Sequence, residues 1–232
     1  MLRSEQPEWQ PKSRHLRRWM LWSGLAAPLC VATSIVAVSL ARPSVSLMHQ
    51  SISLLSEGPQ GFFERLGFVI GGILILLFAG AVHQLWPMAR SLVTAQRATG
   101  GGLLAAGLAI QQGPAPAHGF RIASPWGTLT GVGVVHIVAA AVFFGALVIS
   151  CLTVAQMLYS NPRWRHQAFY SAFSGAAIML LLPAFVITAD LGGPSGGLER
   201  LAGFVAALWQ IWLVRWLQGH AAPRDLSPSQ PS

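Results

Sequence analysis

The chain has 232 residues, of which 53% are hydrophobic and only 9% are charged. A soluble domain carries about 25% charged residues, so this composition excludes an ordinary water-soluble fold. The net charge of +8 does not indicate nucleic-acid binding, because the Lys and Arg residues are spread along the chain and form no basic stripe.

Four stretches contain no charged residue over a length that would cross a membrane: Trp19 to Ala41, Leu66 to Ala89, Ile122 to Pro162 and Ala168 to Ala189. A helix needs roughly 20 mostly apolar residues to cross a hydrocarbon core of about 30 Å. The sequence therefore predicts a multi-pass integral membrane protein.

Two further stretches decide the number of spans. Leu201 to Val214 is strongly apolar and extends past Arg215, because an arginine near a helix end can reach the membrane interface. Ala98 to Gln112 is small and weakly apolar, and the distribution of basic residues decides in its favour. With six spans, one side of the membrane holds Arg42, Arg65, Arg121 and Arg200, and the side of the N-terminus holds Arg3, Lys12, Arg14, Arg17, Arg18, Arg90, Arg97, Arg163, Arg165, Arg215 and Arg224.

We therefore predict an all-α fold, an integral membrane bundle of six transmembrane helices in the cell membrane. Both termini are expected on the cytoplasmic side, where basic residues are retained. A basic cytoplasmic segment covers residues 1–18 and a disordered cytoplasmic tail covers 219–232. The first span has about 23 residues and exceeds a signal-peptide core of about 7 to 15, so we expect an uncleaved anchor. The spans are expected at about 19–41, 66–87, 94–113, 127–158, 167–189 and 200–218.

Glycine spacing predicts where helices cross closely. Gly67 and Gly71, and likewise Gly127 and Gly131, have the GxxxG spacing that lets two helix backbones approach. The Gly/Ala-rich third span is expected to pack inside the bundle for the same reason.

The connection between the first two spans, residues 42–65, is predicted to hold a short amphipathic helix. Val45, Met48, Ile52 and Leu55 recur at helical spacing within it, and Gly58 is expected to end the helix. Pro183 is expected to kink the fifth helix or to free a carbonyl group in it.

Three passages resemble a known family. They are RPSVSLMHQSISLLSEGPQGFFERLGFVIGGIL, the histidine in Val135-His136-Ile137, and GGLERLAGFVAALWQIWLVRWL. Together they resemble the domain-of-unknown-function 998 family from about Trp19 to Leu217. The resemblance implies six membrane helices and carries no established activity.

One segment departs from the family pattern. Members commonly have an acidic, proline-containing segment between the third and fourth helices, whereas Gln112 to His118 contains no carboxylate here. A family function that used that acid would be absent from this protein or would use His118.

Ionisable groups in a membrane are costly, so each is a candidate functional residue. Under the predicted threading, many polar groups lie in the outer half, on the side opposite the termini. Our candidate outer-face ligand cluster is Ser53, His118, His136, Asp190, Glu199 and Arg200.

Each candidate also has a structural interpretation. Glu199 and Arg200 either cap the sixth helix or form a pair that binds a headgroup or donates a proton. His136 either hydrogen-bonds within the bundle or relays protons. Asp190 is either solvated at the end of the fifth helix or catalytic. The catalytic candidates are thus Asp190, Glu199 and His136.

No cofactor and no metal is expected. Cys30 and Cys151 have no partner at metal or redox spacing and are read as small buried apolar residues. His83 and His136 are predicted about 14 Å apart in depth, too far to share a haem.

Two functions remain open. The first is a binding or accessory protein whose outer polar vestibule accepts a lipid or an amphipathic partner. The second is an intramembrane enzyme that acts on a lipidic or isoprenoid substrate by carboxylate and histidine acid–base chemistry. A transporter is a weaker third option, because no inverted repeat is visible. The expected partners are membrane lipids, with a membrane-protein partner or a homo-oligomer also open, and no nucleic acid.

Overall fold

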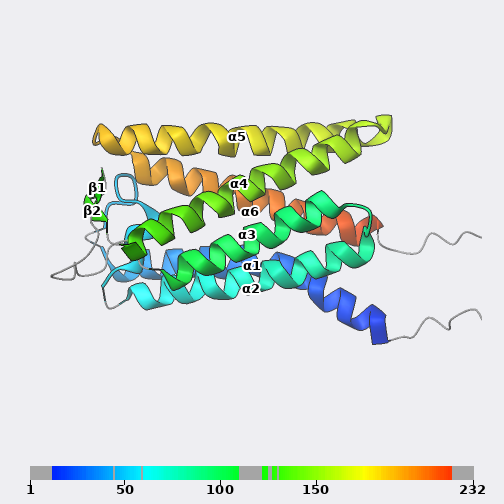
Figure 1. The fold of residues 1–232 in the computed structure, drawn as a ribbon, viewed down its shortest axis with the longest axis horizontal. Helices are drawn as coiled ribbons and strands as arrows, with labels where there is room; N and C mark the ends of the chain where they lie inside the picture. The colour runs from blue at the N-terminus through cyan, green and yellow to red at the C-terminus, as the bar shows by residue number, and fades with distance from the viewer. Residues whose placement is uncertain are drawn as a thin grey trace, which may run out of the picture.

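The computed structural model describes residues 12–43, 45–58, 60–109, 122–124, 127–129 and 131–220. Six long antiparallel helices form the bundle, and both ends of the described chain lie at the same end of it (Figure 1). The opposite end, here called the loop end, carries a short 3-10 helix, a β-hairpin and the turn between the last two helices. The elements are α1 (Lys12–Ala41), η1 (Ile52–Ser56), α2 (Gly61–Leu85), α3 (Arg90–Leu108), β1 (Ile122–Ser124), β2 (Gly127–Leu129), α4 (Gly131–Tyr159), η2 (Pro162–Trp164), α5 (Arg165–Asp190) and α6 (Ser195–His220).

The six helices form a ring in chain order. Each helix packs on the next, and α6 closes the ring against α1 through the loosest of these contacts. The 3-10 helix η1 lies at the loop end against α1, α2 and α6. The ring therefore has a closed side, through α2 to α5, and a weakly closed seam between α6 and α1.

Five of the helices in the described part of the chain are long and apolar enough to cross a membrane, all except α3. The predicted fold class, an all-α membrane bundle of six helices, is confirmed. The α3 helix contains Arg90 and Arg97 and packs between α2 and α4. Its 19 residues rise by about 28 Å, so it runs beside its neighbours for nearly the depth of a membrane.

Small residues let α3 pack closely on both neighbours, as predicted. A Cβ atom added at Gly72 of α2 would lie 2.7 Å from the carbonyl oxygen of Gly100 in α3. A Cβ added at Gly102 would lie 2.6 Å from the backbone nitrogen of Phe143 in α4. Backbones in hydrocarbon gain packing from such close approaches, so α3 is held by its neighbours rather than by its own apolar character.

The first predicted glycine pair makes a close crossing and the second does not. A side chain at Gly67 would overlap the Ser34 side chain of α1, and one at Gly71 would lie 2.6 Å from Val31. Gly127, however, lies in β2, and a side chain at Gly131 would meet nothing within 4 Å.

The predicted start of the fourth span at 127 was wrong for the same reason. Residues 127–129 pair with residues 122–124 in an antiparallel hairpin, so α4 begins only at Gly131. The apolar pattern continued through this segment, but the β ladder takes up its backbone hydrogen bonds.

The connection between α1 and α2 contains a shorter helix than predicted. Helical structure is limited to η1, in which Ile52 and Leu55 are buried, while Val45 and Met48 lie in bends and turns before it. Gly58 has a φ of 76°, which favours glycine, and follows the end of η1 as expected.

Two consecutive hydrogen bonds join α6, α5 and α4 inside the bundle. The buried indole of Trp209 in α6 donates to the Ser171 hydroxyl of α5 at 2.9 Å. That hydroxyl donates to the carbonyl oxygen of Cys151 in α4 at 2.7 Å. Cys151 is a buried free cysteine and Cys30 is partly exposed, so the prediction of a buried apolar residue holds fully only for Cys151.

Adjacent glycines of α3 provide a matched stability test. We expect Gly102→Ala to lower stability by about 1 to 3 kcal/mol, because the new methyl group would press on the α4 backbone. Gly101→Ala adds the same atom where nothing lies within 4 Å, so it should leave stability unchanged or raise it. Thermal unfolding of both variants in the same detergent checks this, and equal melting temperatures would contradict the packing of α3.

Candidate functional site

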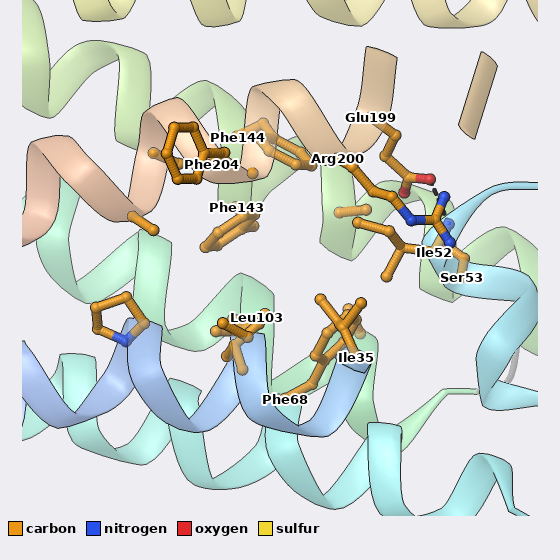
Figure 2. A pocket seen from close by; sticks show the side chains of 18 of the residues that line it. Ile35, Ile52, Ser53, Phe68, Leu103, Phe143, Phe144, Glu199, Arg200 and Phe204 are labelled. Atoms are coloured by element: carbon orange, nitrogen blue, oxygen red, sulfur yellow. Dashed lines mark hydrogen bonds between the residues drawn. The ribbon is translucent and has the colours of Figure 1, made fainter. Parts of the chain in front are cut away.

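A cavity of about 500 Å³ lies inside the ring in the half nearer the loop end. Its walls are apolar side chains from α1, α2, α3, α4 and α6, and residues of η1 close its loop end. Figure 2 shows Phe204 and Phe144 on one side and Leu103, Phe68 and Ile35 on the other. The polar side chains Ser53, Glu199 and Arg200 gather at one end, beside Ile52 (Figure 2).

The seam between α1 and α6 forms the mouth of the cavity. Among the lining residues, Val36 and Leu40 of α1 are 55% and 79% exposed, and Phe204 of α6 is 60% exposed. These side chains lie on helices long and apolar enough to cross a membrane. In a bilayer they would face lipid, so the cavity opens sideways toward the hydrocarbon.

The Glu199 carboxylate is almost completely buried at the loop end of the cavity. It is only 8% exposed and accepts a hydrogen bond from the backbone N–H of Ile52. The Ser53 side chain lies beside the same carboxylate. A buried carboxylate is tolerated only with such donors and a nearby cation, and Arg200 supplies the cation.

The Arg200 guanidinium holds the loop before η1. Its Nη1 atom lies 2.8 Å from the carbonyl oxygens of Leu47 and Gln50 and 3.0 Å from that of Gly196. Its Nη2 atom is buried and has no hydrogen-bond partner among the residues that the structure describes. Within the described part of the chain, the site therefore retains a charged donor that no protein group uses.

Two more contacts fasten the start of α6 to this loop. The Gly197 N–H donates to the Met48 carbonyl at 2.9 Å, and the Ser195 hydroxyl donates to the His49 carbonyl at 3.0 Å. Because α6 begins at Ser195, Glu199 lies beyond its first turn. The interpretation of Glu199 as a first-turn cap is therefore wrong, and the pair holds a loop across the end of the cavity instead.

His136 lines the cavity from α4 and also supports α3. Its Nδ1 atom lies 2.9 Å from the carbonyl oxygens of both Ala106 and Ala109. Both partners are acceptors, so Nδ1 carries the proton and donates. The last carbonyl groups of a helix have no partner within the helix, and His136 satisfies two of them at the end of α3. This agrees with the structural interpretation, in which His136 hydrogen-bonds within the bundle.

The model of the family described as Protein of unknown function (DUF998) matches residues 25–216. The chain belongs to this family. No curated protein and no solved structure matches it. The match covers the cavity, its mouth and the Glu199–Arg200 pair of this DUF998 member.

The structure brings together four of the six predicted cluster residues around this cavity. Ser53, His136, Glu199 and Arg200 all line it. His118 lies outside the described residues, and so does the side chain of Asp190, whose backbone ends α5. Ser53, Glu199 and Arg200 thus form the charged end of the cavity, and His136 lies on a separate wall.

Sequence reasoning missed several buried polar residues, two of which bear on the charged end of the cavity. Gln210 lines the cavity on α6 and lies 11 residues after Glu199, or three helical turns, on the same face. Glu64 is fully buried at the start of α2, within electrostatic range of Glu199, but does not line the cavity. Helical spacing from Glu199 could have found Gln210, whereas Glu64 was read as lying outside the second span.

Among the described residues, no three His, Cys, Asp or Glu side chains form a group that could hold a metal ion. What the cavity offers is a shape, an apolar wall and hydrogen-bonding groups. It can hold an elongated apolar molecule and bind its polar end.

His136 provides a test of the support for α3. We expect His136→Leu to lower stability by about 1 to 3 kcal/mol, because two buried carbonyl groups lose their donor. His136→Asn can place an amide nitrogen near the position of Nδ1 and should recover part of that loss. Thermal unfolding of the three proteins checks this, and equal destabilisation by Leu and Asn would argue against the hydrogen bonds.

Proposed function

We propose that this DUF998 member is a membrane binding or accessory protein that takes a lipid or another amphipathic molecule into the cavity. The tail enters through the seam between α1 and α6, and the head binds at Ser53, Glu199 and Arg200. The observation that carries this proposal is a mostly apolar cavity with exposed side chains at a lateral mouth and a buried charged pair at one end.

The dimensions of the cavity support a lipid-like ligand. From Glu199 to Gln210 the α6 lining rises by about 16 Å, at about 1.5 Å per residue. One leaflet of a bilayer has a hydrocarbon depth of about 15 Å, half of the whole core. A tail of leaflet length therefore fits beside α6 with its head at the loop end.

The chemistry of the charged end favours an uncharged, hydroxyl-bearing head. Glu199 and Arg200 are of opposite charge, so a net charge on the ligand would not be compensated at this buried place. A hydroxyl group both donates and accepts, so one hydroxyl can accept from Arg200 Nη2 and another can donate to the carboxylate.

The predicted orientation belongs to the same proposal. With both termini in the cytoplasm, the loop end lies on the outer side of the cell membrane and the ligand comes from the outer leaflet. The distribution of basic residues supports this, because Arg163 lies in η2 between α4 and α5 and Arg165 begins α5, at the same end as the termini.

A binding role has more support than the enzymatic alternative. His136 donates to two carbonyl groups, and Glu199 and Arg200 hold the η1 loop. These contacts give each side chain a role in holding the fold around the cavity, and this role accounts for its burial without a reaction. The acid–base alternative would be favoured by turnover of a bound lipid that depends on Glu199.

Gly203 lines the cavity, and a Cβ atom added there would lie within 4 Å of no described neighbour, so a larger side chain at this position can fill the cavity. We expect Gly203→Leu to abolish retention of lipid by the purified protein, because the new side chain would occupy the cavity. The control Gly219→Leu lies on the same helix, outside the cavity, with nothing within 4 Å of the new Cβ. Mass spectrometry of lipid extracted from equal amounts of each protein checks this. Unchanged lipid in Gly203→Leu would contradict the proposal.

The orientation can be tested by labelling with a membrane-impermeant maleimide. In a Cys30→Ser background, Leu191→Cys, at the loop end, should react on intact cells. Met88→Cys, between α2 and α3, should react only after the membrane is opened. Both positions are highly exposed, at 79% and 91%, so burial would not limit either reaction. The opposite pattern would reverse the proposed orientation.

A further inference from the structure

The deep end of the cavity contains a polar side chain that none of the described residues satisfies. Gln210 lines the cavity and is only 3% exposed. Neither its amide nitrogen nor its amide oxygen has a hydrogen-bond partner. Leaving a buried polar group unsatisfied costs about 1 to 3 kcal/mol. A ligand that forms hydrogen bonds with this side chain would remove that cost.

The residues around this end do not satisfy the amide. Thr99 also lines the cavity, but its hydroxyl donates to the Ala95 carbonyl at 2.9 Å within α3. The other lining residues include Ala27 of α1, Leu147 of α4 and Ala206 of α6 itself, and all three are apolar. A buried water makes about 3 hydrogen bonds, more than one amide in an apolar wall supplies.

We infer that Gln210 is a second hydrogen-bonding site in the cavity and binds an uncharged polar group on the tail of the ligand. This inference rests on the proposed function, because it concerns the same ligand in the same cavity. The ligand is therefore polar at two points, its head and a position on its tail about 16 Å away, as given by the rise of α6.

The amide determines the kind of group it binds. It offers donors on its nitrogen and an acceptor on its oxygen, so a hydroxyl group can satisfy both atoms. A charged group is excluded, because the lining residues of this end carry no charge to compensate it. The ligand class is a long-chain amphipath whose tail carries a hydroxyl or a similar uncharged group.

Alcohols of matched length test this inference. The full chain in nanodiscs is incubated with tritiated dodecanol, which is then competed by unlabelled monoalcohols and by the α,ω-diols of the same lengths. We expect the diol to bind with higher affinity than the monoalcohol of the same length when its two hydroxyl groups are about 16 Å apart. This gain in affinity is called the diol gain. In Gln210→Leu this gain should fall about tenfold, the equivalent of one hydrogen bond at a buried site.

Gln96→Leu is the matched control. Gln96 is also fully buried with an unpartnered amide, but it does not line the cavity, so its loss should leave the diol gain unchanged. An equal diol gain in the natural protein and in Gln210→Leu, or no gain in either, would overturn the inference while the proposed function stands. Failure of every alcohol to bind, with Gly203→Leu also without effect on bound lipid, would overturn the proposed function itself.

Discussion

The fold of this protein around its cavity depends on one interaction, the contact of Arg200 with the carbonyl groups of Leu47 and Gln50. These carbonyls belong to the irregular, exposed loop that precedes η1 at the loop end. Irregular backbone near hydrocarbon is stable only where its polar groups find partners inside the protein. The guanidinium donates hydrogen bonds to two of them, and the neighbouring Glu199 carboxylate accepts a hydrogen bond from the N–H of Ile52.

That interaction explains why the cavity is open on one side and closed at one end. The bound loop places η1 across the end of the ring, so the helices there need not pack tightly to exclude water. Elsewhere close packing closes the ring, through glycines between α2, α3 and α4 and through Trp209 and Ser171 between α5 and α6. Between α6 and α1 the glycine contact lies toward the other end of the bundle, where a Cβ added at Gly24 would lie 2.7 Å from Val214, and the seam beside the cavity is the loosest contact of the ring.

The fold was largely predictable from the sequence, and the errors in the predicted starts of α2 and α6 have a common cause. In the sequence, charged residues predict the helix ends and put the start of α2 at residue 66 and that of α6 at residue 200. The helices begin at Gly61 and Ser195 instead. Charge marks where a helix leaves hydrocarbon, whereas backbone hydrogen bonds mark where it ends, and Glu64 shows that a carboxylate can be buried within the first helical turns.

The candidate site was predictable only in part, for a different reason. The sequence grouped residues by their expected depth, which correctly placed Ser53 near Glu199 and Arg200. Depth says nothing about which face of a helix a residue occupies, and the cavity selects by face. Thus His136 is directed to the end of α3 by two carbonyl groups, and Gln210, deep and uncharged, gave no signal of its own. A polar residue in a membrane helix becomes informative once its helical face is compared with that of a buried charge.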